Sequence, residues 1–163
     1  MEIEKKVLVA IDLNFETSFI LTQAASFFRE NAAKFYILHV ISSAPFSIIN
    51  RKANLQLKMK EAHEAVEDGL KKSGLYYLNY EIFISYGFPA SEILNFSRKK
   101  GSDLIAIGTH QKIGVKEFIS GSISFSVAKN SLCPVLLIPL KNSIKLSKEE
   151  LAKEPAVSLV NPS

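Results

Sequence analysis

Short, continuous apolar runs recur along the chain and predict buried β-strands. Four runs rich in β-branched residues cover residues 7–11, 35–41, 104–107 and 135–138. Continuous rather than alternating apolar runs are typical of strands covered on both faces, as in a parallel sheet between helices. A fifth segment, 80–85, is less uniformly apolar and predicts a strand nearer the edge of the sheet.

Between these runs, apolar residues recur at helical spacing. The pattern predicts helices over residues 16–31, 52–72, 89–100 and 119–130. Strict alternation of strand and helix predicts a doubly wound α/β domain, with a five-stranded parallel sheet and helices on both faces. The first helix is expected to turn Phe27 and its apolar neighbours inward, and the last to form a stripe of Ile119, Ile123 and Val127.

The length suits one domain, because 163 residues are enough to bury a sizeable core. We assign that domain to residues 1–140 and treat 141–163 as a C-terminal tail. The tail has few large apolar residues and contains Pro155 and Pro162. Ser147-Lys148-Glu149-Glu150 is a capping-box pattern that would start one short helix. We expect the tail to be partly disordered or docked on a partner.

Charge and cysteine content argue against several classes of protein. The net charge is +4, but Lys and Glu are interspersed, which favours a solvated surface over a nucleic-acid partner. The single cysteine, Cys133, cannot form an internal disulfide and is expected to be a small buried residue rather than a nucleophile. The first apolar run is too short for a signal peptide or a membrane span, so we expect a cytoplasmic protein with no membrane partner.

Candidate chemistry is sought at the carboxyl ends of the strands, where ligands of open parallel sheets bind. Gly121 and Ser122 open the last helix, and its free N–H groups together with the Ser122 and Ser124 hydroxyls form a phosphate cradle on physical grounds. Simple helix capping by Ser120 or Ser122 explains the same residues equally well.

Two further strand ends carry residues of interest. Asp12 follows the first strand and would accept a ribose hydroxyl or hold a cation, although a turn-fixing or capping role is slightly favoured. Gly108, near the end of the fourth strand, would make room for a ligand or adopt an unusual backbone conformation, although an ordinary turn glycine is favoured.

The histidines suggest no metal site. His110 lies in the candidate loop after the fourth strand and would touch a phosphate, whereas His39 is expected in the core and His63 in solvent. No Cys–His pair has metal-ligand spacing, so we expect no structural zinc. The chain also lacks the Walker phosphate loop, the dinucleotide-binding glycine motif and the nucleophile elbow, so we assign no catalytic residue.

Three segments, in order, resemble the universal stress protein family. They are VLVAID at 7–12, YGFPASEIL at 86–94, and DLIAIGTH at 103–110 followed by Gly121-Ser122 and CPVLLIP at 133–139. The resemblance covers roughly residues 3–140. It implies a stress-response protein with the sheet of adenine nucleotide alpha hydrolase-like folds. It also implies an unidentified protein partner and a homodimer formed through the last strand, at Val135, Leu136, Leu137 and Ile138.

One branch of the family binds ATP through a G-x2-G-x9-G-[ST] pattern. Gly108, Gly121 and Ser122 match this pattern, while Gln111 replaces the middle glycine. The resemblance therefore implies ATP as the ligand, with or without Mg²⁺, or no ligand at all. It places Asp12 at the ribose and the backbone of Val40 at the adenine. The residues implied around the phosphates are Gly108, His110, Gln111, Gly121, Ser122, Ile123 and Ser124.

Gln111 leaves two functions open. A positive φ at this position would cost a non-glycine residue about 1 kcal/mol or more, and its side chain would crowd a phosphate or donate a hydrogen bond to it. The first hypothesis is a regulatory protein that binds an adenine nucleotide and hydrolyses it slowly at most. The second is a nucleotide-independent interaction module of the same fold.

Overall fold

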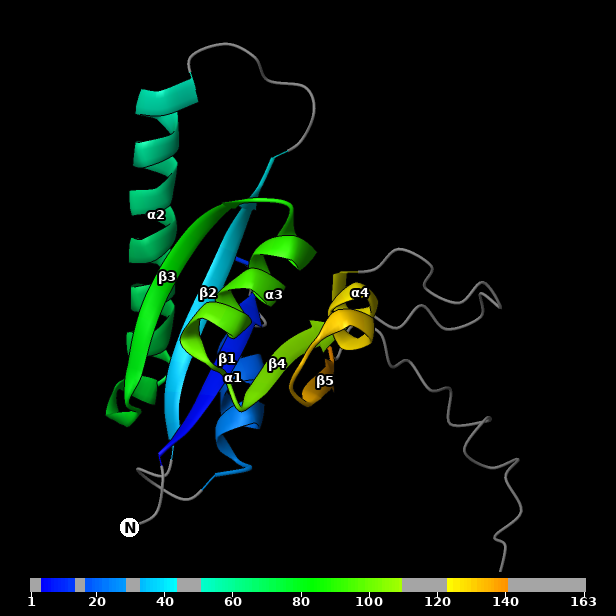
Figure 1. Ribbon diagram of the computed structural model, residues 1–163. Coiled ribbons are helices and arrows are strands. Elements are labelled where there is room, and N and C mark those ends of the chain that lie inside the picture. Colours follow the sequence, from blue (N-terminus) through cyan, green and yellow to red (C-terminus); the bar gives the residue numbers. More distant parts are fainter. Residues whose placement is uncertain (1–3, 14–16, 29–32, 44–50, 110–122, 141–163) are drawn as a thin grey trace, which may run out of the picture.

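The computed structural model describes residues 4–13, 17–28, 33–43, 51–109 and 123–140 (Figure 1). Strands and helices alternate as predicted. The elements are β1 (Lys5–Ile11), α1 (Thr17–Ala25), β2 (Ala33–Ser42), α2 (Arg51–Lys72), a 3-10 helix η1 (Leu75–Tyr77), β3 (Tyr80–Gly87), α3 (Pro89–Lys100), β4 (Leu104–Thr109), α4 (Ile123–Asn130) and β5 (Val135–Pro139). The strands form one parallel sheet in the order β3-β2-β1-β4-β5, which confirms the predicted fold class.

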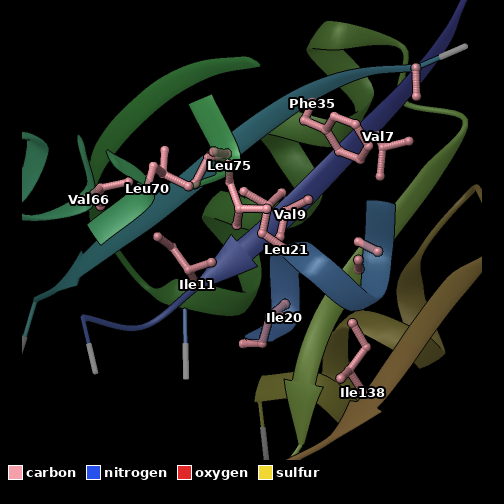
Figure 2. Close-up of a cluster of buried hydrophobic side chains, with 14 of the residues drawn as sticks. Val7, Val9, Ile11, Ile20, Leu21, Phe35, Val66, Leu70, Leu75 and Ile138 are labelled. Atoms are coloured by element: carbon pink, nitrogen blue, oxygen red, sulfur yellow. The ribbon is translucent and has the colours of Figure 1, made fainter. Parts of the chain in front are cut away.

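Helices cover both faces of the sheet. Because successive side chains of a strand point to opposite faces, each central strand contributes to two cores. Val7, Val9 and Ile11 of β1 belong to the core that α1 and α2 cover. Leu8 and Ala10 belong to the second core, under α3 and α4. Figure 2 shows the first core, in which side chains from β1, β2, α1, α2, η1 and β5 meet. The central strands are thus buried on both faces, as their continuous apolar runs predicted.

The first helix is shorter than predicted, because α1 ends at Ala25. The N–H groups of Phe27 and Phe28 bond to the carbonyls of Ala24 and Ala25, three residues back, so the chain tightens and leaves the α-helical path. Phe28 still packs edge-on against Phe35, with 6.2 Å between ring centroids. Phe27, predicted to point inward, is instead 65% exposed.

The last strand, β5, lies at one edge of the described sheet. Ile138 is buried, whereas Leu137 is 44% exposed. The apolar run 135–138 suggested full burial, but Ile138 alone of these four residues is buried, and among the described strands β5 pairs only with β4. The prediction that 80–85 lies at an edge is confirmed, since β3 forms the opposite edge.

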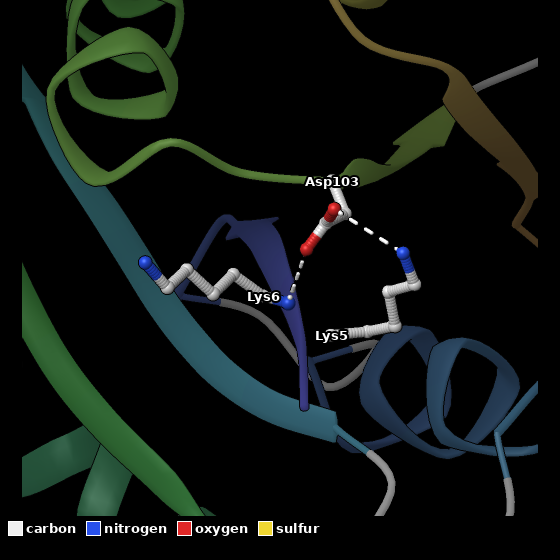
Figure 3. A network of polar contacts seen from close by, with 3 residues as sticks. All are labelled: Lys5, Lys6 and Asp103. Atoms are coloured by element: carbon white, nitrogen blue, oxygen red, sulfur yellow. Dashed lines mark hydrogen bonds and ion pairs between the residues drawn. The ribbon is translucent and has the colours of Figure 1, made fainter. Parts of the chain in front are cut away.

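At the amino edge of the sheet, Asp103 joins the starts of β1 and β4 (Figure 3). Its N–H donates to the carbonyl of Lys6, and the N–H of Lys6 donates to Asp103 Oδ2, each over 2.8 Å. Lys5 Nζ lies 3.5 Å from Asp103 Oδ1. The hydrogen bond from the Lys6 N–H, with the charge of Lys5 in support, lowers the pKa of the Asp103 carboxyl.

Candidate functional site

A cavity of about 360 Å³ lies at the carboxyl edge of the sheet. The strand order reverses at this edge, because β1 pairs with β2 on one side and with β4 on the other. Open parallel sheets bind ligands at such a switch point. The lining residues come from β1, β2, β4, the amino-terminal parts of α1, α3 and α4, and the residues that follow β1 and β5: Ala10, Ile11, Asp12, Ile20, Leu38, Val40, Ser42, Pro89, Ile93, Ile107, Gly108, Ile123, Ser124 and Leu140.

All the predicted site residues within the described ranges line this one cavity, namely Asp12, Val40, Gly108, Ile123 and Ser124. The other predicted residues lie outside the described ranges: His110, Gln111, Gly121 and Ser122. The structure thus brings together residues that are far apart in sequence. Their contact with a ligand stays a prediction.

Asp12 fixes the turn that leaves β1. Its Oδ1 accepts a hydrogen bond from the N–H of Leu13 at 2.9 Å, and its main-chain carbonyl accepts one from Thr17 Oγ1 at 2.7 Å. The turn-fixing role favoured from the sequence is therefore present. A carboxylate has about four acceptor positions, so the exposed Asp12 side chain can also accept a hydroxyl at the cavity.

The backbone of β2 extends past β1 into the cavity wall. Pairing of β2 with β1 ends at His39, whereas pairing with β3 continues to Ser42. Val40 and Ser42 follow Leu38 at the two-residue period of a strand, and all three line the cavity. In the described part of the chain, no strand pairs with the β1-facing side of residues 40–42. Backbone N–H and C=O groups there are suited to a planar ligand with its own donor and acceptor.

Gly108 is a packing glycine rather than the turn glycine that the sequence favoured. It lies within β4, and its φ is not in the left-handed range. A Cβ atom at this position would come within 2.9 Å of Ile20 Cδ1 and 3.0 Å of Leu140 Cδ1. The missing side chain therefore lets Ile20 and Leu140 close the floor of the cavity.

The first residues of α4 face the cavity. Ser124 is buried, whereas Ile123 is 45% exposed. Of the predicted stripe, Val127 is fully buried and Ile123 lies on the cavity wall, while Ile119 lies outside the described residues. The amino end of a helix carries a partial positive charge, so this wall favours an anion.

Ser42, Pro89 and Ile93 also line the cavity, although they were not predicted as site residues. Ser42 is a polar residue at the end of the second strand, which is the same signal that singled out Asp12. Pro89 is the first residue of the helix predicted over 89–100, but it was not predicted as part of the site. The rule that ligands bind at strand ends would have found Ser42 had it been applied to the second strand.

The other chemically interesting residues lie away from the cavity lining. His39 is buried, with Nδ1 3.2 Å from the carbonyl oxygen of Ile11, and His63 is exposed, as predicted for both. Cys133 is half-buried rather than buried. Its Sγ lies 3.5 Å from Ser131 Oγ and 3.6 Å from Ser97 Oγ. Among the described residues, no three His, Cys, Asp or Glu side chains are placed to hold a metal ion.

The described helices also include none that is long and apolar enough to cross a membrane.

Comparisons with known proteins agree with this architecture. The sequence model of the universal stress protein family matches residues 4–139. The universal stress protein YxiE of Bacillus subtilis is 33% identical over an alignment of 146 residues. The match covers 82% of this chain and 97% of YxiE.

Solved structures share the fold. The structure of MJ0577, a universal stress protein of Methanocaldococcus jannaschii, superposes with a TM-score of 0.69 at 30% identity and covers 86% of this chain and 99% of its own. A universal stress protein from Archaeoglobus fulgidus in complex with dAMP gives a TM-score of 0.58 at 20% identity, covering 85% of this chain and 99% of that one. The family match over most of the chain, on a sheet with the expected strand order, shows that this protein belongs to the universal stress protein family.

Proposed function

We propose that this chain is a regulatory protein that binds an adenine nucleotide in the cavity at the carboxyl edge of its sheet. The observation that carries the proposal is the convergence of Asp12, Val40, Gly108, Ile123 and Ser124 on one cavity at the switch point. The dAMP complex of the Archaeoglobus fulgidus relative supports the choice of nucleotide class. ATP with Mg²⁺ is the first ligand to test.

The lining suggests how the ligand would lie. Most of the lining side chains are apolar, which suits the two faces of a purine ring. The backbone of Val40, beyond the end of β1, would pair with the polar edge of the ring. Asp12 would accept a ribose hydroxyl, and the start of α4 would meet the phosphates. We assign binding as the function, with slow hydrolysis at most.

Gln111 favours a second candidate, a nucleotide-independent interaction module of the same fold. Gln111 stands where the ATP-binding pattern has its middle glycine, and it lies outside the described residues. A side chain at that place would occupy room needed by a phosphate. The two candidates differ in one measurable property, which is the affinity for a nucleotide.

The test is calorimetric titration of ATP and Mg²⁺ into nucleotide-free protein, with Gln111→Gly measured alongside. Micromolar binding by the natural protein supports the nucleotide proposal. Binding only by Gln111→Gly means that the cradle is intact but blocked, and favours the interaction module. Absence of binding by both variants removes the nucleotide proposal.

The variant Asp12→Asn tests whether the nucleotide binds at Asp12. An asparagine keeps an acceptor oxygen for the Leu13 N–H and removes the charge, so the turn is retained. We expect its affinity to fall by roughly three- to tenfold, the worth of one hydrogen bond at about 0.5–1.5 kcal/mol. An unchanged dissociation constant would contradict the assignment of the ribose to Asp12.

We further propose that the protein acts in the cytoplasm as a homodimer formed through β5. β5 is a sheet edge, and its Leu137 side chain is 44% exposed. Leu137→Lys places a charge in that contact and is expected to yield monomers in sedimentation velocity, with the fold retained by circular dichroism. A natural protein that sediments as a monomer would exclude the dimer.

A further inference from the structure

The polar side chains of the cavity come from different elements. Among the described lining residues, only Asp12, Ser42 and Ser124 carry polar side-chain groups. Asp12 and Ser124 belong to the elements beside the switch point, where β1 and β4 end. Ser42 stands apart at the end of β2, beyond the last residue that pairs with β1. A ligand with an apolar body and more than one polar group matches this lining.

Ser42 is held in place by the neighbouring end of β3. Its register partner is Gly87, and the N–H of Ser43 donates to the carbonyl of Gly87 at 3.0 Å. Gly87 has a φ of 155°, and a Cβ atom there would lie 3.0 Å from Glu92 Cγ. The carboxylate of Glu92 in turn accepts a hydrogen bond from the hydroxyl of Ser85. The strand end that carries Ser42 is thus fixed before any ligand arrives.

We propose that the Ser42 hydroxyl contacts the exocyclic amino group of the adenine base and so contributes to base selection at this site. This inference rests on the proposed function. With the ribose at Asp12 and the phosphates at α4, the base lies against β2, and its polar edge faces residues 40–42. The amino group is the polar substituent on that edge of adenine, and a hydroxyl oxygen accepts from it.

The experiment pairs a change in the protein with the matching change in the ligand. Affinities of the natural protein and of Ser42→Ala are measured for adenosine 5′-monophosphate and for purine riboside 5′-monophosphate, which lacks the amino group. We expect Ser42→Ala to weaken binding of the first ligand by roughly three- to tenfold, as for one hydrogen bond, and to leave the second unchanged. An equal loss for both ligands, or no loss for either, overturns the inference.

Ser43→Ala is the matched control. Ser43 is the adjacent serine in sequence, and it does not line the cavity. Its backbone N–H, which bonds Gly87, is retained in the variant. We expect Ser43→Ala to bind both ligands as the natural protein does. Failure of the natural protein to bind either of these ligands, and also ATP with Mg²⁺, refutes the proposed function itself, whereas binding without a Ser42-dependent preference refutes only the assignment of Ser42.

Discussion

The amino and carboxyl ends of the parallel strands, called here the amino edge and the carboxyl edge, differ in structure. At the amino edge, hydrogen bonds join the loops to the strands. The N–H of Asp103 donates to the carbonyl of Lys6, and the carboxylate of Asp103 accepts from the N–H of Lys6 (Figure 3). At the carboxyl edge, β1 stops short of β2, Gly108 lacks a side chain, and a cavity of about 360 Å³ remains. The contacts of Asp103 and the cavity proposed to bind a ligand thus lie at opposite ends of the same strands.

Aromatic side chains add to the amino edge. Tyr36, Phe83 and Phe96 pack against one another on the α3 face, with ring centroids 4.8–6.2 Å apart. Lys100, in the last turn of α3, places its Nζ 4.4 Å from the centroid of Phe83 and 5.1 Å from that of Tyr36. Variants at this edge should change stability and spare binding, while variants at the carboxyl edge should change binding.

The largest effect is expected at the carboxyl edge, from Gly108→Ala. The new Cβ would approach the ends of the Ile20 and Leu140 side chains, which line the cavity and must shift. Overpacking of this kind costs about 1–2 kcal/mol and should lower the urea midpoint. The same shift narrows the cavity, so nucleotide affinity should fall as well. Both quantities are measured on one preparation, by urea denaturation and by calorimetric titration.

Gly69→Ala is the control for this variant. Gly69 lies inside α2, and a Cβ atom there would meet no atom within 4 Å. Alanine favours a helix over glycine by about 0.5–1 kcal/mol, so Gly69→Ala should raise the urea midpoint and leave affinity unchanged. A Gly108→Ala variant as stable as the natural protein, with full affinity, would contradict the packing role of Gly108.

A smaller effect is expected at the amino edge from Asp103→Asn. The pKa of Asp103 is lowered in the folded protein, so its carboxylate contributes stability above the unfolded value of 3.8, and that contribution is lost as the pH falls through the folded pKa. The side chain is 41% exposed, which limits the cost of the substitution near pH 7 to about 1 kcal/mol. Urea midpoints at pH 7 and pH 3 should show the difference shrinking at the lower pH.

Asp68→Asn serves for comparison, because Asp68 pairs with Lys72 on the exposed face of α2 and such pairs contribute little. Nucleotide affinity should be the same in both aspartate variants. A difference between Asp103→Asn and the natural protein that persists unchanged at pH 3 would show that the charge of Asp103 is not the cause.

The fold was predictable because its central strands are buried on both faces. Their apolar runs are continuous for that reason, and the alternation with amphipathic helices then fixes a parallel sheet. The same signal failed at β5, where Leu137 is exposed although the run is just as apolar. A sequence pattern reports the chemistry of a residue, and it does not report whether a neighbouring element covers that residue.

The candidate site was predictable at its strand ends and less so elsewhere. Asp12 and Gly108 stood out because polar residues and glycine interrupt or follow apolar runs. The role of Gly108 was predicted wrongly, because a glycine is needed there to avoid contact with Ile20 and Leu140, which are distant in sequence. Ser42 was not predicted because it lines the cavity only where β2 extends beyond the end of β1. The register that produces this extension depends on two strands and cannot be read from one segment of sequence.

The smallest effect is expected from Lys100→Gln, again at the amino edge. Glutamine keeps much of the aliphatic stem but removes the charge above Phe83 and Tyr36, so the free energy of unfolding should fall by about 0.5–1 kcal/mol. The neighbouring Lys99→Gln, at an exposed position of the same helix, removes an equal charge without this aromatic contact and should cost less. Both variants should bind nucleotide like the natural protein. Equal urea midpoints for the two variants would mean that the rings contribute nothing beyond the loss of one positive charge near the end of α3.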